Sequence, residues 1–180
     1  MKHNHSIFLQ DYNLENNPET SFFHIIPVPY EKTVSYGHGA ANGPEAILKA
    51  SSKLELYDCF SSPYEHGIFT QPPVDCDKDE LICLEEINNR VKSVLDKNKI
   101  PVILGGEHTV SVGAFKAFKQ KFNDIGVVQF DAHTDLRDSY FGGNLSHACV
   151  MRRAFEMNIR IFQIGIRSLS LEEEIFRKEN

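Results

Sequence analysis

Three acidic side chains and one histidine follow an apolar run in the segment VVQFDAHTDLRDSYFGG, residues 127–143. Asp131, His133 and Asp135 are spaced two residues apart, and alternate side chains of an extended chain point to the same side. Holding two carboxylates and an imidazole together is costly unless a divalent cation neutralises them. Such ligands suit Mn²⁺, Mg²⁺, Fe²⁺ or Zn²⁺. The spacing therefore predicts a metal site, although a lone D-x-H is usually a solvated loop whose aspartate caps a helix.

His108 is the predicted fourth ligand. It follows the apolar run IPVIL and a pair of glycines, which allow a tight turn at the end of a strand. Taken alone, a histidine at the start of a helix more often packs or caps than binds a metal. Because ligands of parallel sheets bind beyond the carboxyl ends of the strands, we expect His108 to lie beside Asp131.

His147, in the segment GGNLSHACVMRR, has two interpretations that the sequence leaves open. It is either a surface histidine in the first turn of a helix capped by Ser146, or an acid/base group near the metal, where a pKa close to neutrality is useful. His38 is a weaker candidate, because its glycine-rich loop follows a predicted strand. The remaining histidines show no metal-ligand spacing and are interpreted as structural or solvated.

Strands that alternate with helices must position these residues. The hydrophobic pattern predicts strands over 22–29, 100–104, 126–130 and 160–166, and helices over 45–58, 78–97, 146–157 and 170–178, with a further helix after Thr109 that turns Val112, Phe115 and Phe118 inward. This alternation indicates an α/β fold with a mostly parallel sheet. With 180 residues and no internal repeat, the chain is interpreted as a single domain.

The composition excludes several classes of protein. The net charge of −6 argues against nucleic-acid binding, which usually requires a basic patch, and fits a cationic small molecule. The chain shows neither a secretory signal nor an apolar run long enough to cross a membrane. Four dispersed cysteines without a C-x-x-C pair favour reduced thiols in a cytoplasmic protein over a disulfide framework.

Several of these segments together resemble one family. GGEHT, FDAHTDLRD, NLSHACVMRR and QIGIRS are similar to motifs of the ureohydrolases, which include arginases and agmatinases, and VSYGHGAANGPEAILKAS resembles the first loop and helix of that family. The resemblance spans residues 22–170. It implies a three-layer α/β/α fold with a mostly parallel sheet, a pair of Mn²⁺ ions and, in complete members, a homo-oligomer.

The resemblance also implies roles for individual residues. His108 and Asp135 map to ligands of one ion, His133 to a ligand of the other, and Asp131 to a bridge between the two. His147 maps to a histidine that shuttles protons. Asn144 and Ser146 map to substrate contacts. Glu107 stands where the family motif often has Asp or Asn, and we give this difference no weight because the position is not a ligand.

The implied reaction is the hydrolysis of agmatine to putrescine and urea, in which a hydroxide that bridges two manganese ions attacks the guanidinium carbon. The subfamily assignment rests on Ser146, which precedes His147 as in agmatinases, whereas arginases carry histidine directly after the Asn-Leu pair. An arginase, a guanidinobutyrase and a deacetylase of a related fold remain alternatives.

One family segment has no counterpart here. The motif S-x-D-x-D-x-x-D-P supplies two further aspartate ligands in ureohydrolases, and the sequence reaches Asn180 before any such motif. We therefore expect an incomplete domain over residues 1–180, with weaker binding of at least the second ion, an unpaired strand edge and an uncovered apolar face. Activity of this chain is in doubt, and a non-catalytic metal-binding relative is the alternative, which metal stoichiometry would distinguish.

Overall fold

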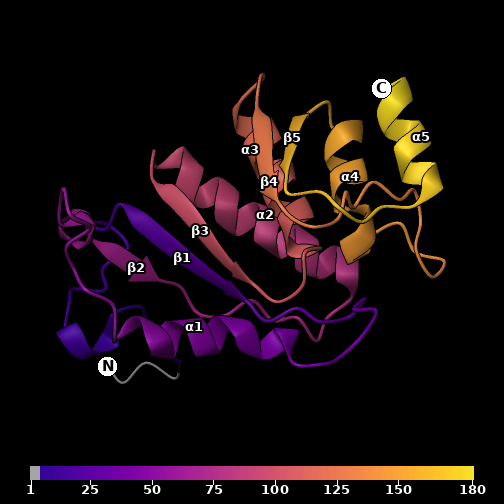
Figure 1. Ribbon diagram of the computed structural model, residues 1–180. Helices are drawn as coiled ribbons and strands as arrows, with labels where there is room; N and C mark the ends of the chain where they lie inside the picture. Colours follow the sequence, from indigo (N-terminus) through magenta and orange to yellow (C-terminus); the bar gives the residue numbers. More distant parts are fainter. Residues whose placement is uncertain (1–4) are drawn as a thin grey trace.

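The computed structural model describes residues 5–180, in which strands and helices alternate along the chain (Figure 1). The strands are β1 (Phe23–Val28), β2 (Ile68–Thr70), β3 (Ile100–Gly105), β4 (Gly126–Phe130) and β5 (Arg160–Ile164); the α-helices are α1 (Gly43–Ser51), α2 (Glu80–Asp96), α3 (Val110–Lys121), α4 (Val150–Glu156) and α5 (Leu171–Glu179). Short 3-10 helices span Gln10–Tyr12, Ala40–Asn42, Pro63–His66 and His147–Cys149. Among these residues, none of the helices combines the length and the apolar character that a membrane span requires.

The strands form two parallel sheets, in the orders β2-β1-β3 and β4-β5. In the first sheet Phe23 pairs with Ile100 and Val28 with Gly105, so β1 and β3 end at the same edge. In the second sheet Phe130 pairs with Ile164. The prediction of a mostly parallel sheet is confirmed, because every ladder between the described strands is parallel.

The main core lies between the sheets and the layer of α2, α3 and α4. Its members share almost complete burial and come from β1, α2, α3 and α4; they include Ile26, Val28, Ile87, Val91, Ala117, Val150 and Met151. α2 and α3 pack along each other, while α1 packs on β1 and β3 from the other side of the first sheet (Figure 1). Helices therefore cover both faces of the first sheet.

The second sheet is covered on one face only. Val127 and Ile161 pack against the core, but the alternate residues Phe130 and Phe162 are 77% and 58% exposed. Within residues 5–180, β3 and β4 do not pair with each other, so each keeps an edge without a strand partner. The expected unpaired edge and uncovered apolar face are thus confirmed.

Several element boundaries differ from the prediction, and three of these differences have a structural cause in nearby hydrogen bonds. α1 ends at Ser51 rather than at residue 58. The Ser51 hydroxyl donates to the Leu48 carbonyl, and the amides of Lys53 and Leu54 bond carbonyls three residues back, which replaces the α-helical pattern by tighter turns. β5 ends at Ile164, since the amides of Arg167 and Ser168 leave the strand direction to bond the Ala132 carbonyl. The predicted helix over 146–157 starts as a 3-10 turn before α4. β2, only three residues long, was not predicted.

The contact between α2 and α3 generates a stability prediction at Gly113. A Cβ at this position would lie 2.7 Å from the Leu84 carbonyl oxygen and 2.8 Å from Ile87 Cβ. We expect Gly113→Ala to lower the free energy of unfolding, since overpacking costs ~1–3 kcal/mol and exceeds the helix-propensity gain of ~1 kcal/mol. Urea denaturation measures the difference. Gly143→Ala, where the nearest atom would be 3.8 Å away, is the matched control and should be close to neutral; a stabilised Gly113→Ala would contradict this packing.

Candidate active site

The candidate site lies at the edge where β1, β3 and β4 end. After β3 the Gly106 amide donates to the Val28 carbonyl, and the backbone passes so close to β1 that a Cβ on residue 106 would lie 2.1 Å from the Tyr30 oxygen. Only glycine fits this approach. The turn brings His108 to the start of α3, while Asp131 follows directly on β4 and donates its amide to the Ile164 carbonyl.

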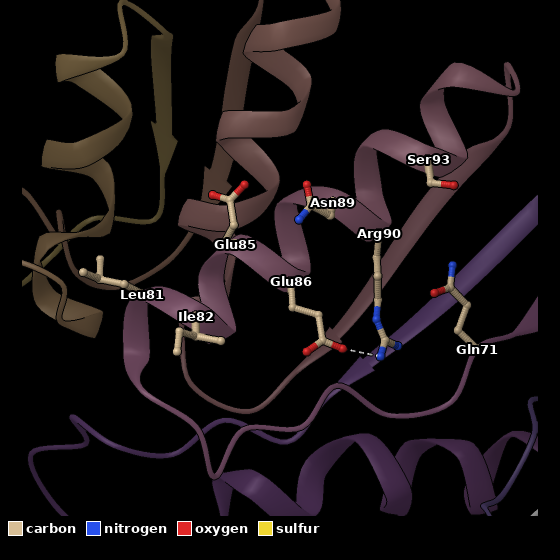
Figure 2. A pocket seen from close by; sticks show the side chains of 8 residues that line it. All are labelled: Gln71, Leu81, Ile82, Glu85, Glu86, Asn89, Arg90 and Ser93. Atoms are coloured by element: carbon tan, nitrogen blue, oxygen red, sulfur yellow. Dashed lines mark hydrogen bonds and ion pairs between the residues drawn. The ribbon is translucent and has the colours of Figure 1, made fainter.

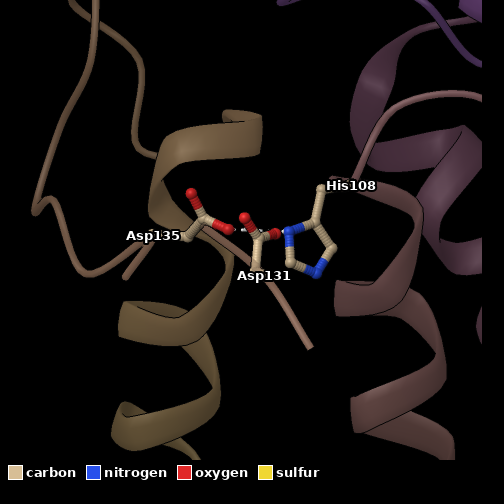
Figure 3. A group of neighbouring side chains, drawn as sticks. All are labelled: His108, Asp131 and Asp135. Carbon is tan, nitrogen blue, oxygen red and sulfur yellow. Dashed lines mark hydrogen bonds and ion pairs between the residues drawn. The ribbon is translucent and has the colours of Figure 1, made fainter. Parts of the chain in front are cut away.

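His108, Asp131 and Asp135 each offer one ligand atom, and these atoms all lie within 4.8 Å of one another (Figure 3). His108 Nδ1 is 2.9 Å from Asp135 Oδ2. The Gln129 side-chain amide donates to the same Oδ2 at 2.9 Å. Asp135 is buried, and its carbonyl accepts bonds from the first turn of α4. Contacts of both its side chain and its backbone therefore fix the position of Asp135.

His133 contacts Asp131 but is not part of the group of three. Its backbone amide donates to Asp131 Oδ1 at 2.8 Å, its Nδ1 lies 3.3 Å from the same oxygen, and its side chain is 63% exposed. Burial alone would raise the pKa of Asp131, but the bond from the His133 amide, the nearby His108 and Gln129 outweigh it, so this pKa is lowered. The Asp131 carboxylate is therefore ionised at neutral pH and lies close to both His108 and His133.

This arrangement does not arise from strand alternation as predicted. β4 ends at Phe130, and the chain then turns, with Asp135 in the left-handed region at φ 50°. As a result Asp131 and Asp135 meet His108 at one point, whereas His133 stays outside that group of three. The expectation that all side chains of D-x-H-x-D converge at a single point is wrong, because the extended geometry does not persist.

His147 faces the same cleft as these residues. The cleft has a volume of about 620 Å³, and its lining includes His108, Asp131, His133, Asp135 and His147. His147 Nδ1 lies 3.2 Å from the Thr33 hydroxyl and Nε2 lies 3.0 Å from the Ser35 hydroxyl. The Tyr140 ring meets the imidazole edge-on. His147 thus begins a short helix, as one interpretation held, and also lines the cleft, as the other required.

Asn144, Ser146 and His38 are not among the residues that line this cleft. Ser146 is buried and its hydroxyl accepts from the Ala148 amide, so it caps the 3-10 helix. Asn144 is exposed. The His38 ring lies 3.2 Å from Glu31 and is otherwise open to solvent. The substrate contacts expected of Asn144 and Ser146 therefore stay a prediction, which this geometry does not favour.

Glu107 organises the site, although its sequence position had been given no weight. It is 6% exposed, and its carboxylate accepts from the Thr33 amide at 3.1 Å and the Thr33 hydroxyl at 2.9 Å. The Thr33 oxygen in turn accepts from the His147 amide at 3.1 Å. A charged residue between two glycines and a candidate ligand is the signal that could have revealed this role.

Glu173 holds a second loop of the site in place, as Glu107 holds the segment around Thr33. Ser170 and Glu173 form a capping box at the start of α5, and the buried carboxylate also accepts from the Thr134 hydroxyl at 2.7 Å and the Leu136 amide at 3.1 Å. Burial would raise its pKa, but these hydrogen bonds outweigh the effect and lower the pKa of Glu173. The S-x-x-E pattern of Ser170 and Glu173 indicates the start of a helix. The sequence does not indicate that the Glu173 carboxylate also bonds the loop around Asp135.

A larger hollow, of about 720 Å³, lies on the outer face of α2 (Figure 2). Its charged groups are paired: Arg90 bonds Glu86, and Glu85 bonds Lys116. Its lining contains neither histidine nor cysteine. The chemistry of the described residues therefore points to the cleft around His108 rather than to this hollow.

Comparison with known proteins agrees with this fold and site. The sequence profile of the arginase family matches residues 22–180, and the chain belongs to the arginase family. It has the three-layer α/β/α fold of that family. It superimposes on the agmatine ureohydrolase of Thermoplasma volcanium with a TM-score of 0.87 at 32% identity, covering 99% of this chain and 61% of that one.

Two curated relatives show similar identity. The N(1)-aminopropylagmatine ureohydrolase of Synechocystis sp. is 37% identical over 166 residues, which are 87% of this chain and 54% of the relative. The agmatinase of Bacillus subtilis is 37% identical over 162 residues, 85% of this chain and 54% of the relative. The chain thus spans about half the length of these relatives.

The role of Glu107 can be tested by Glu107→Ala. We expect the free energy of unfolding to fall by about 1–3 kcal/mol, because the half-buried Thr33 amide and hydroxyl lose their acceptor. We also expect faster hydrogen exchange at the amides of Thr33 and His147. Urea denaturation and exchange measured by mass spectrometry are the readouts. Glu85→Ala, which removes an exposed ion pair, is the control and should cost at most ~1 kcal/mol; equal effects would contradict a positioning role.

The lowered pKa of Glu173 generates a pH prediction. Its contribution to stability is complete above the ordinary glutamate pKa of 4.5 and is lost as pH falls through the lower folded value. We therefore expect Glu173→Gln to be less stable than wild type at pH 7, with the difference narrowing below pH ~4.5. Denaturation at several pH values measures this. Glu174→Gln, at a half-buried carboxylate that pairs with Arg177 and Lys178, should show a smaller difference, and parallel pH profiles of wild type and Glu173→Gln would refute the assignment.

Proposed function

We propose that the chain provides the metal-binding and proton-transfer residues of a ureohydrolase that cleaves a guanidino alkylamine, agmatine or its aminopropyl derivative, to urea and an amine. The observation that carries this proposal is the group of His108, Asp131 and Asp135 in a cleft that His147 also lines. Family membership and the names of the relatives support the substrate class.

The donor set fits a pair of Mn²⁺ ions. His108, Asp131 and Asp135 would hold one ion, and the imidazole nitrogen and carboxylate oxygens are ligands that suit a borderline-hard cation. Asp131 and His133 would hold the second, since His133 Nδ1 lies 3.3 Å from Asp131 Oδ1. When bound, two close divalent ions lower the pKa of water and supply a hydroxide nucleophile near neutral pH.

The residues around the ions bind and orient. Gln129 holds Asp135 by its side-chain amide, a contact that fixes the direction of the carboxylate. The Thr33 hydroxyl donates to Glu107, so its oxygen can accept from His147 Nδ1, and Nε2 lies 3.0 Å from the Ser35 hydroxyl. These contacts hold the imidazole at the cleft, where it would take a proton from the reacting centre and return it to the amine that leaves as the carbon–nitrogen bond breaks.

The charges of the cleft favour an amine substrate over an amino acid. Bound metal ions would neutralise Asp131 and Asp135, so the preference depends on whether a free cation of the protein can meet a substrate carboxylate. Arg137 also lines the cleft, but its guanidinium lies 5.0 Å from the Tyr140 ring centroid and 3.8 Å from Glu173 Oε2. Because this cation is already partnered, a substrate carboxylate such as that of arginine or guanidinobutyrate finds no free positive group among the described residues that line the cleft.

The test combines metal binding with urea release. We expect the purified chain to bind Mn²⁺, and Gln129→Ala to weaken binding about 10–100-fold. With Mn²⁺ present we expect more urea from agmatine or aminopropylagmatine than from arginine, and a loss of about 10²–10⁴-fold in His147→Asn with metal binding retained. Calorimetry and a urea assay measure these quantities.

Asp138→Asn is the matched control, since Asp138 is an exposed acid of the same segment that bonds Arg153 instead of facing the ligands. Equal loss of Mn²⁺ in Asp138→Asn and Asp135→Asn would refute the assigned ligands. Tight Mn²⁺ binding without urea from any guanidino compound would favour the non-catalytic alternative, in which these residues bind metal but need ligands from outside this chain to react.

A further inference from the structure

Two cysteines lie together outside the cleft. Cys76 precedes α2 and Cys83 lies in its first turns, and their sulfur atoms are 3.5 Å apart. Cys83 is fully buried, whereas Cys76 is half-buried and opens the pair to solvent. The other two cysteines differ: Cys59 is exposed in a loop, and Cys149 is buried at the start of α4.

The two sulfurs differ in their affinity for a proton. The sulfur–sulfur hydrogen bond with Cys76 lowers the pKa of Cys83, and the nearby Lys32 cation lowers it further against the effect of burial. The same sulfur–sulfur bond, together with burial, raises the pKa of Cys76. The pair therefore shares one proton more readily than two isolated thiols would, and thiolate is the form that reacts with oxidants.

The backbone around Cys76 can close the remaining gap. A disulfide requires sulfurs about 2.05 Å apart, so the pair must approach by roughly 1.5 Å. Cys83 is fixed in the packed face of α2, but the neighbours of Cys76, Asp75 and Asp77, are exposed. The segment is anchored at Val74, whose amide donates to the Pro27 carbonyl. Closing the gap by movement of residues 75–78 therefore costs less free energy than displacing Cys83 from the packed face of α2.

We propose that Cys76 and Cys83 are a redox-modification site that a peroxide converts to an intramolecular disulfide. One thiolate attacks the peroxide, the oxygen–oxygen bond breaks, and a sulfenic acid and hydroxide form; the hydroxide takes a proton from solvent and becomes water. The second thiol attacks that sulfur, a sulfur–sulfur bond forms, and a second water leaves with the remaining proton. The two sulfurs together lose two electrons, which the peroxide gains. The proposal is independent of the reaction in the cleft.

The same residues link this pair to the site. The Lys32 ammonium group donates to the Lys78 carbonyl, two residues from Cys76, and the Tyr30 hydroxyl donates to Glu80 Oε1 at 2.5 Å. The next residue, Thr33, bonds Glu107 and His147. Closing the disulfide therefore displaces the segment 30–33, in which Thr33 bonds His147.

The test uses the whole chain treated with hydrogen peroxide, alkylated and digested with trypsin. Lys78 separates the two cysteines, so the disulfide joins peptide 54–78 to peptide 79–90 with the mass of both less two hydrogen atoms. A thiol reductant should release the two peptides. Because peptide 54–78 also contains Cys59, we expect Cys59→Ser to keep the cross-link and Cys76→Ser to abolish it.

Other results would overturn the proposal. A cross-link that is lost in Cys59→Ser assigns the disulfide to the wrong pair, and sulfinic acid on Cys76 without any cross-link shows that the sulfurs do not close. Circular dichroism of each serine variant checks that it folds. Hydrogen exchange at Lys32 and Thr33 should change between the reduced and oxidised chain; unchanged exchange there would remove the link to His147.

Discussion

The buried carboxylate of Glu107 joins three segments that are far apart in the sequence. It accepts hydrogen bonds from Lys32 and Thr33, which follow β1, lies beside the candidate ligand His108 at the start of α3, and reaches His147 through the Thr33 hydroxyl. A charge without a cation partner is tolerated in this interior because several donors solvate it. The walls of the cleft therefore depend on one side chain that neither binds a metal nor reacts.

Glu173 has the matching function at the opposite wall. Its carboxylate accepts from Thr134 and Leu136 on either side of Asp135, while its own helix is capped by Ser170. Both carboxylates are held by hydroxyl and amide donors, and each positions a loop of the site. Glu173 also lies 3.8 Å from the Arg137 guanidinium, which lines the same cleft.

The spacing between the two halves of the site is set by helix packing. β3, which leads to His108, and β4, which leads to Asp131, do not hydrogen-bond to each other in the part of the chain that the structure describes. Their relative position follows from α3, which packs between α2 and α4. Since Gly113 lies at the tightest α2–α3 contact, the geometry of the ligands depends on a helix interface remote from them.

The sequence by itself determined the parallel α/β order and the two strands whose loops carry His108 and Asp131, because hydrophobic periodicity and the position of polar residues after apolar runs are local properties. Only the tertiary structure decided that Asp135 joins those two while His133 contacts Asp131 alone, that Glu107 and Glu173 support the loops, and that Cys76 meets Cys83. The direction of a side chain beyond a strand depends on backbone dihedrals, such as the left-handed Asp135, that distant hydrogen bonds impose. Contacts of Thr33 with Glu107 and of Thr134 with Glu173 join residues that are 74 and 39 positions apart, and a local pattern does not contain them.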